Sequence, residues 1–295
     1  MTDGHAPLEN RGLAIAFMMA TLFCFVSLDA IVKYALESYS LVQVTWGRFF
    51  FATVFSVFLC LKDFPRLAIS KVPGMQFIRS VALMATTVLF NLGIMTEPLA
   101  TATTIMFLSP IVVTLLSIVV LKEQVGLRRW IGILIGFFGA IIVVQPWEMT
   151  GSAVNVGAFF LLAAAFSNGA YQIITRKVRA DNPLTSLLFT AAAGAVFSSL
   201  ILPWYWQWPD VWGWTLLIAS GFAGALGHYF LIEAMRRAPA SVVAPFSYSS
   251  LIWATLFGYI IWHELPTANV WIGAALIIAA GLYIYVRERV KKAEH

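Results

Sequence analysis

Long apolar runs, separated by a few polar or helix-breaking residues, follow one another along the whole chain. A helix needs about 20 mostly apolar residues to cross the hydrocarbon core of a bilayer. Ten runs approach that length, at approximately 12–36, 41–61, 73–95, 99–121, 129–146, 154–175, 184–203, 213–235, 239–262 and 268–286. No polar segment between them is long enough for a separate soluble domain. The pattern therefore predicts an all-α integral membrane protein with ten transmembrane helices.

Positive charge alternates between the connections that join these runs. The odd-numbered connections contain no Lys or Arg, whereas every even-numbered connection and the C-terminal segment are basic. Because cytoplasmic loops carry the excess of Lys and Arg, the alternation predicts that the even-numbered connections and both termini are cytoplasmic. The tryptophan-rich stretch 204–214 then falls on the outer side, where aromatic rings favour the membrane interface.

The second half of the chain repeats the first with an offset of 141 residues. Over residues 98–144 the offset gives nine identities without a gap, at Pro98, Ser109, Ile111, Thr114, Leu115, Glu123 and the Trp-Ile-Gly run 130–132. The chain thus divides into residues 1–150 and 151–295, with five helices each. Two successive halves with an odd number of helices must cross the membrane in opposite senses. Inverted repeats are typical of alternating-access transporters, whose substrate site lies near the midplane between the repeats.

Several stretches carry a family resemblance. They are "VTWGRFFFATV", "MFLSPIVVTLLSIVVLKE" and "WIGILIGFFGAIIVV" in the first half, and "SYSSLIWATLFGYIIWHE" and "WIGAALIIAAGLYIYV" in the second. With them, nearly the whole chain resembles the drug/metabolite transporter superfamily, specifically its ten-helix members with two EamA-type repeats. Within that superfamily the chain looks like a bacterial amino-acid exporter of the YddG type. The resemblance implies efflux of amino acids or similar small metabolites across a bacterial inner membrane.

The two halves differ at functionally interesting positions. The second half has Leu251 where the first has Pro110, and the seventh run has no arginine to match Arg48 in the second run. Pro110 lies near the middle of its run, so we predict a helix kink there that frees backbone carbonyls. Without a proline, the corresponding ninth helix is expected to bend less.

Composition excludes several classes of protein. The chain is 60% hydrophobic and 11% charged, with a mean hydropathy of +0.84, which no soluble surface could accommodate. The net charge of +5 does not indicate nucleic-acid binding, because the basic residues form short clusters between apolar runs. Cys24 and Cys60 lie in apolar runs, which predicts no disulfide framework and no metal site. We expect no cofactor and, without a recognisable catalytic motif, no enzyme activity.

Charged residues inside the apolar runs are candidates for gates or for structural pairs, because such residues are costly in lipid. Asp29 and Lys33 share a face of the outer part of the first helix, and Arg48 lies roughly 10 Å into the second. Arg48 either pairs with Asp29 or binds a substrate carboxylate in an outer vestibule. On the cytoplasmic side, Arg79 and Glu233 lie at similar depth, so an inner ion pair between them is expected.

Polar residues near mid-depth are candidates for substrate binding. They are Thr87, Asn91, Ser109, Asn168, Tyr171, Gln172, His228, Tyr229, Tyr248 and Ser250. For each Ser or Thr the alternative is a hydrogen bond to its own helix or to a neighbouring one. His228 can bind an amino or a carboxylate group, or titrate. Glycines such as Gly132 and Gly136 fit packing inside the bundle better than a dimer contact, so we expect a monomer or a weak homodimer.

The cargo is restricted by what the middle of the helices lacks. Few cationic side chains lie at mid-depth to bind phosphate, and the central thirds of the helices carry no carboxylate for a cationic drug. Aromatic and small polar residues suit a neutral or zwitterionic molecule, which includes the aromatic amino acids. The alternatives are an exporter of another small metabolite or drug, or a channel. Facilitated transport is favoured over proton coupling, for which Asp29, His228 and Glu233 are the candidate groups.

Overall fold

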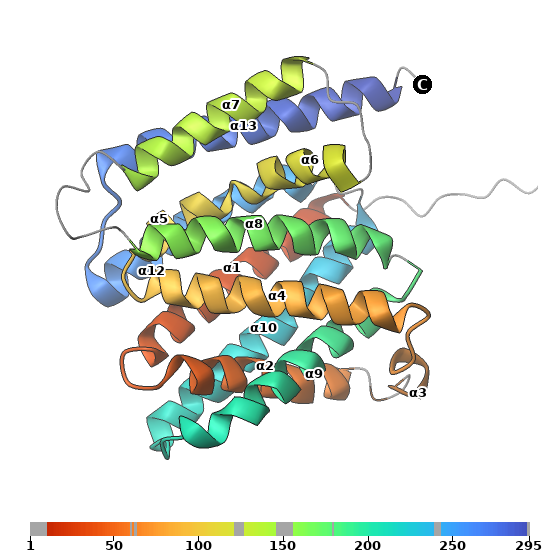
Figure 1. Ribbon diagram of the computed structural model, residues 1–295, viewed down its shortest axis with the longest axis vertical. Coiled ribbons are helices and arrows are strands. Elements are labelled where there is room, and N and C mark those ends of the chain that lie inside the picture. Colours follow the sequence, from red (N-terminus) through yellow and green to blue (C-terminus); the bar gives the residue numbers. More distant parts are fainter. Residues whose placement is uncertain are drawn as a thin grey trace, which may run out of the picture.

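The computed structural model describes residues 11–59, 61, 64–120, 127–145, 156–178, 180–238 and 243–293. Within these ranges all regular secondary structure is helical (Figure 1). The helices are α1 (Arg11–Ala35), α2 (Leu41–Leu59), α3 (Phe64–Leu67), α4 (Pro73–Ile94), α5 (Leu99–Met106), α6 (Ser109–Val120), α7 (Leu127–Val144), α8 (Val156–Lys177), α9 (Pro183–Ile201), η3 (Leu202–Trp204), α10 (Val211–Arg237), η4 (Ala244–Ser249), α12 (Ser250–Trp262) and α13 (Ala268–Ala293).

The ten predicted apolar runs all correspond to helical segments. In the described part of the chain, seven segments are long and apolar enough to cross a membrane. Three shorter apolar helices, at Trp130–Val144, Phe246–Trp262 and Ala268–Tyr283, occupy the remaining predicted positions. The all-helical, ten-span prediction is therefore confirmed.

Connections of the same parity meet at the same end of the bundle. Tyr39, in the first connection, donates its hydroxyl proton to Asp210 Oδ1 in the seventh, with an O–O distance of 3.1 Å. The backbone amide of Lys71, in the second connection, donates to Asp181 Oδ1 in the sixth at 2.7 Å. These contacts place odd-numbered connections together and even-numbered connections together, as the alternation of charge requires.

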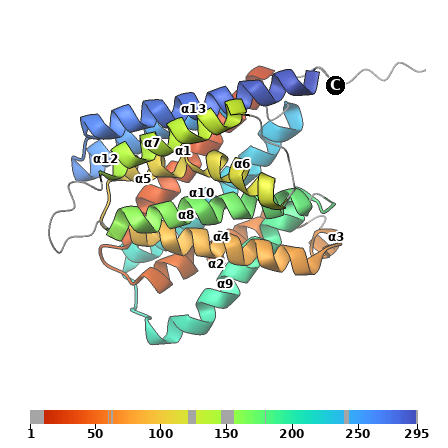
Figure 2. The same cartoon turned by 45° about the horizontal axis from the view of Figure 1, so that its top comes forward.

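The helices pack in the pairs that an inverted repeat produces. Helix α1 of the first half packs against α10 of the second, and the equivalent pair, α8 and α4, also packs together. Likewise α2 packs against α10, and its counterpart α9 packs against α4. Three pairs join equivalent elements of the two halves: α2 with α9, α5 with α12, and α7 with α13 (Figures 1 and 2). The predicted boundary between residues 150 and 151 lies outside the described residues.

The fourth and ninth spans are both irregular, at equivalent positions. Helix α5 ends at Met106 and α6 begins at Ser109, so Phe107 and Leu108 separate them directly before Pro110. In the ninth span, η4 ends at Ser249 and α12 begins at Ser250, which the 141-residue offset matches to Ser109. In the ninth span no residue separates the two segments, and the 3-10 segment carries Pro245 near its start. The expectation that the fourth helix bends more than the ninth stays a prediction.

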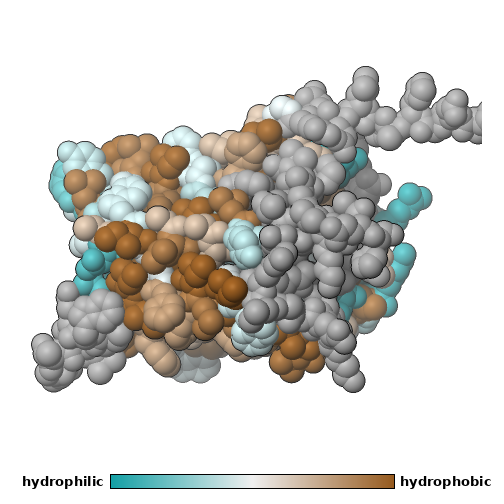
Figure 3. All heavy atoms as spheres, turned by 90° about the horizontal axis from the view of Figure 1, so that it is seen from above, coloured by the Kyte–Doolittle hydropathy of each residue, from teal (hydrophilic) through white to brown (hydrophobic). Residues whose placement is uncertain are grey.

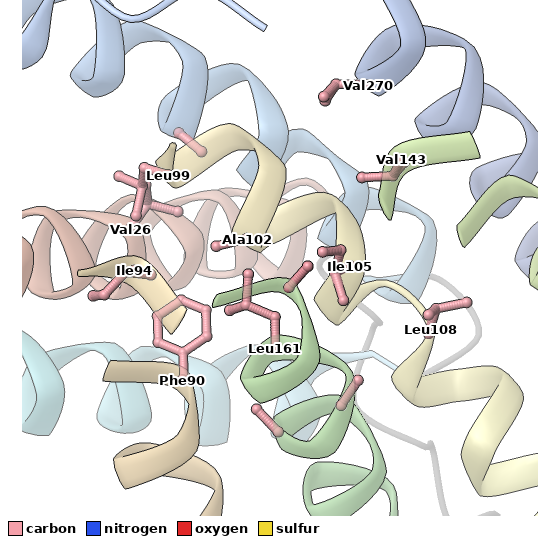
Figure 4. Packing of buried hydrophobic residues seen from close by; sticks show 14 of the residues in the cluster. Val26, Phe90, Ile94, Leu99, Ala102, Ile105, Leu108, Val143, Leu161 and Val270 are labelled. Carbon is pink, nitrogen blue, oxygen red and sulfur yellow. The ribbon is translucent and has the colours of Figure 1, made fainter. Parts of the chain in front are cut away.

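A buried apolar cluster surrounds the interrupted fourth span (Figure 4). It includes Leu99 and Ile105 of α5, Val26 of α1, Phe90 of α4 and Leu161 of α8, all less than a tenth exposed. The cluster fixes α5 between helices of both halves. Burial of this kind stabilises a fold even in lipid, where tight packing takes the place of the hydrophobic effect.

The outward-facing surface is apolar. Figure 3 shows brown, hydrophobic side chains over the α7 and α13 side of the molecule. Phe137 and Phe138 of α7 are 60% and 61% exposed, and Trp271 and Ile272 of α13 are about half exposed. Exposed apolar surface of this extent is typical of contact with lipid. In contrast, Gly136 and Gly139 of α7 face the bundle, where added Cβ atoms would meet Ile111 and Gly273.

Candidate functional site

Glycines of α10 bring three helices unusually close together. A Cβ at Gly221 would lie 2.4 Å from Phe51 Cβ of α2, and one at Gly227 would lie 2.7 Å from the ring of Phe25 of α1. Only residues without a side chain permit this approach. The close packing of α1 and α2 on α10 puts Asp29, Arg48 and His228 on three mutually packed helices.

Asp29, Arg48 and His228 form a group of charged and polar side chains enclosed within the bundle. Asp29 and Arg48 are each other's electrostatic partners, and His228 interacts electrostatically with Arg48 and Arg79. All three of the group are half-buried. Neither Asp29 nor Arg48 makes a direct ion pair or hydrogen bond with another described residue, so of the two alternatives for Arg48 the direct contact with Asp29 is not formed. Their polar atoms are also not among the sealed, unpartnered atoms, so they face accessible space.

His228 is held in one orientation by its neighbours. Its Nδ1 lies 2.9 Å from the carbonyl oxygen of Gly224, one turn earlier in α10. The edge of its ring packs against Phe25, with 4.8 Å between ring centres. A carbonyl can only accept, so Nδ1 carries a proton, and in the neutral ring Nε2 is an acceptor. Nε2 remains available to a further donor.

Asn91 of α4 contacts Thr45 of α2, one helical turn before Arg48. Its Nδ2 donates to Thr45 Oγ1 at 3.3 Å, and its Oδ1 is buried without a partner. Thr45 and Arg48 are three residues apart and share a face of α2. Thr87, one turn before Asn91, is also buried. Asn91 therefore contacts α2 one helical turn from Arg48, and Thr87 lies on the same face of α4 as Asn91.

A second group of predicted residues lies at the interrupted helices. Asn168 of α8 donates its Nδ2 proton to Ser109 Oγ, at the start of α6, over 3.1 Å. Phe107 and Tyr248, which the repeat offset makes equivalent, pack edge to face with ring centres 5.1 Å apart. Ser250 instead donates to the carbonyl of Ser247 in its own segment at 2.8 Å, which is the alternative expected for any membrane serine.

The expected ion pair between Arg79 and Glu233 is absent from the described side chains. Arg79 donates to Tyr171, Thr175 and Thr190, and to the backbone carbonyl of Ser186. Glu233 is bound by the two arginines that follow it in α10, at positions 236 and 237. The hydrogen bonds of Arg79 thus connect α4 to α8 and α9, and Tyr171 is one of the acceptors. Arg79 and Glu233 therefore both have other partners, and they do not pair with each other.

Two remaining candidates, Gln172 and Tyr229, are half-buried and form no hydrogen bond with the described residues.

Sequence reasoning missed a cluster at the outer end. There Lys33 Nζ donates to the Glu97 carbonyl at 3.0 Å and pairs with Glu264 Oε2 at 3.0 Å. The sequence feature that could have indicated this cluster is the glutamate that occurs in both halves of the chain, since Glu264 matches Glu123.

Comparisons with known proteins agree with this architecture. A sequence profile described as the EamA-like transporter family matches residues 12–145 and 155–286, one match for each half. A crystal structure aligns with a TM-score of 0.65 at 18% identity, covering 93% of this chain and 96% of that one. This likeness shows a shared fold.

Named relatives transport different small molecules. An S-adenosylmethionine uptake transporter of Rickettsia bellii is 27% identical over 284 residues, covering 96% of both chains. A pseudopaline exporter of Pseudomonas aeruginosa is 27% identical over 275 residues, covering 92% of this chain and 95% of the relative. A riboflavin transporter of Vibrio cholerae is 32% identical over 178 residues, covering 60% of this chain and 59% of the relative. One is described as an uptake transporter and another as an exporter, so these matches agree on transport and not on direction.

Proposed function

This chain belongs to the EamA-like transporter family, and on that premise we propose that it exports amino acids or similar small metabolites by alternating access. Membership makes it a multi-pass membrane transporter of small molecules and not an enzyme. We propose the substrate and the direction of transport. We also propose a location in the bacterial inner membrane and a monomeric or weakly dimeric state.

The observation that carries the proposal is the enclosed group of Asp29, Arg48 and His228 within an inverted-repeat bundle. Polar groups without protein partners inside a membrane protein mark a substrate path. When the two repeats exchange conformations, the substrate site opens to the opposite side of the membrane. Both charges of the group and its aromatic neighbour Phe25 suit a zwitterion with an apolar part. S-adenosylmethionine, named for the rickettsial relatives, is itself an amino-acid derivative.

Uptake into proteoliposomes tests the proposal. Purified protein should move labelled amino acids, with aromatic and other neutral ones fastest, in a panel that also contains S-adenosylmethionine, riboflavin, a sugar phosphate and an organic cation. Transport should saturate with concentration, because each cycle carries bound substrate. If the protein transports none of the amino acids, the amino-acid proposal is refuted. Single-channel currents in planar bilayers would refute alternating access.

A further inference from the structure

We propose that Arg48 and Asp29 together form the recognition site for a zwitterionic substrate, with the guanidinium binding its carboxylate and the Asp29 carboxylate binding its ammonium group. The inference rests on the proposed function and deepens it. The cargo must carry a carboxylate, which Arg48 binds, and an ammonium group, which Asp29 binds.

The first argument comes from what Arg48 lacks. A guanidinium has five N–H donors, and Arg48, although half-buried, uses none of them in a hydrogen bond to a described residue. Its Cζ lies 5.8 Å from the ring centre of Phe49, the next residue in α2. Asp29 likewise receives no hydrogen bond from the described residues. Charges left in this state inside a membrane protein need a partner from outside the protein.

Arg79 provides the comparison within the same molecule. All three of its guanidinium nitrogens donate, and its acceptors are the oxygens of two helices packed against α4. That is the environment of an arginine with a structural role. Arg48 has the same chemistry, a similar depth from the opposite end of the bundle, and none of those acceptors.

The signs of the two charges select the cargo. An anion without a positive group would bind Arg48 but would be repelled by Asp29, and a simple cation would meet the reverse problem. A zwitterion satisfies both, because Arg48 can hold a carboxylate through two parallel hydrogen bonds while Asp29 accepts from an ammonium. Asp29 and Arg48 attract each other without touching. That arrangement allows a small zwitterion to bind between them without first breaking a strong ion pair.

A neighbouring acceptor fits an ammonium group as well. The Nδ1 of His228 is engaged by the Gly224 carbonyl, which leaves Nε2 as an acceptor. The ring of His228 packs on Phe25, which lies one helical turn before Asp29 in α1 and supplies an apolar surface for the rest of the molecule. The site is therefore built from α1, α2 and α10, which come from both repeats.

The test compares one amino acid with two analogues that each lack one charge. L-phenylalanine, 3-phenylpropionate and 2-phenylethylamine compete against labelled L-phenylalanine for uptake by the full-length protein in proteoliposomes. If another amino acid is transported faster, its own deaminated and decarboxylated forms take their place. Wild-type protein should bind each analogue about tenfold or more weakly than the amino acid, the equivalent of one charge-assisted contact.

The variants should change selectivity in opposite directions. Asp29→Asn should weaken L-phenylalanine about tenfold while leaving 3-phenylpropionate unchanged or tighter. Arg48→Gln should weaken L-phenylalanine and 3-phenylpropionate alike while sparing 2-phenylethylamine. A general folding defect would lower all three together and cannot produce this reciprocal pattern. Arg66→Gln, an exposed arginine of α3, is the matched control and should leave all three affinities unchanged.

The outcomes separate the two proposals. Wild-type transport of amino acids with no change of selectivity in either variant would overturn this site and leave the proposed function intact. Wild-type protein that moves no amino acid would overturn both. The reciprocal shift would support both, and would identify the ammonium and the carboxylate as the groups that are read.

Discussion

Cationic side chains inside the bundle differ in the partners they find. Lys33 pairs with Glu264 and the Glu97 carbonyl at the outer end, and Arg79 is saturated by oxygens nearer the cytoplasmic end. Arg48 alone of these three lacks such partners among the described residues. The first two hold helices together, whereas Arg48 retains its donors for another molecule.

Asp181 gives a prediction about pH at the cytoplasmic end. Partial burial raises the pKa of Asp181, but hydrogen bonds from Gln76, Ser70 and the Lys71 amide, with the charge of Lys71, outweigh it and hold the pKa below its ordinary value. A carboxyl with a lowered folded pKa stabilises the fold above its unfolded pKa, about 3.9. That stabilisation is lost as the pH falls through the folded pKa.

Melting temperatures of the wild-type protein and of Asp181→Asn should therefore differ at neutral pH and converge below about pH 4. Ser70→Ala, which removes one of the donors, should show a smaller difference with the same dependence on pH. A difference that stayed constant from pH 7 to pH 3 would show that the charge of Asp181 does not contribute.

At residue scale, the sequence identified the groups but not their partners. Asp29, Arg48 and His228 could be selected because such residues are rare and costly in lipid. The partners of Arg79 could not, because a long side chain reaches acceptors on two neighbouring helices, and its depth along one helix does not reveal them. Glu233 similarly bonds within its own helix.

At the scale of elements, the crossing of α2 and α10 depends on Gly221. Alanine there would place its Cβ 2.4 Å from Phe51 Cβ and 2.6 Å from the Ala52 nitrogen, and the backbone cannot yield cheaply. We expect Gly221→Ala to destabilise the protein by about 1–3 kcal/mol, as overpacking does. Gly74→Ala is the control, because a Cβ at Gly74 meets nothing within 4 Å. Thermal unfolding in detergent measures both, and equal melting temperatures would contradict the close approach.

The helices themselves were readily predicted from the sequence, but their irregularities only in part. Apolar length and alternating charge locate each span, because lipid enforces both. Pro110 indicated the interruption in the fourth span. The change from 3-10 to α-helix before Ser250 was not predicted, although Pro245 lies five residues earlier in the same 3-10 segment. Tyr248, near this change, packs against Phe107, a contact between segments distant in sequence that the sequence alone does not reveal.

At the scale of the whole molecule, the contacts of Lys33 predict which end is closed. Lys33 joins α1 to the α4–α5 connection and to Glu264 after α12, so it ties three elements together at the outer end. The Lys33 side chain is buried and that of Glu264 is partly exposed. Loss of an ion pair that contributes about 1 kcal/mol shifts a two-state equilibrium about fivefold. Lys33→Gln should therefore favour opening of the outer end.

Thiol labelling can measure this shift. Thr45→Cys, in a protein whose native cysteines are replaced, places a thiol at a buried position beside Asn91. An impermeant reagent added outside should label it about fivefold faster when Lys33→Gln is also present. Glu264→Gln should give a similar increase, and the two together should add little, because both remove the same tie. Unchanged labelling would show that this ion pair does not keep the outer end closed.

The contact between Phe107 and Tyr248 has an energetic consequence for the working cycle. These residues occupy equivalent positions in the two halves and meet each other. In a perfectly symmetric chain, a conformation closed at one end and its inverted image would have equal free energies, and each would be half populated. Every position at which the halves differ, such as Pro110 against Leu251, therefore weights one orientation over the other. A net difference of about 1.4 kcal/mol across all such positions sets a tenfold resting preference, so the sum over all unmatched residues, whether or not they touch the cargo, biases which side of the membrane the empty protein faces.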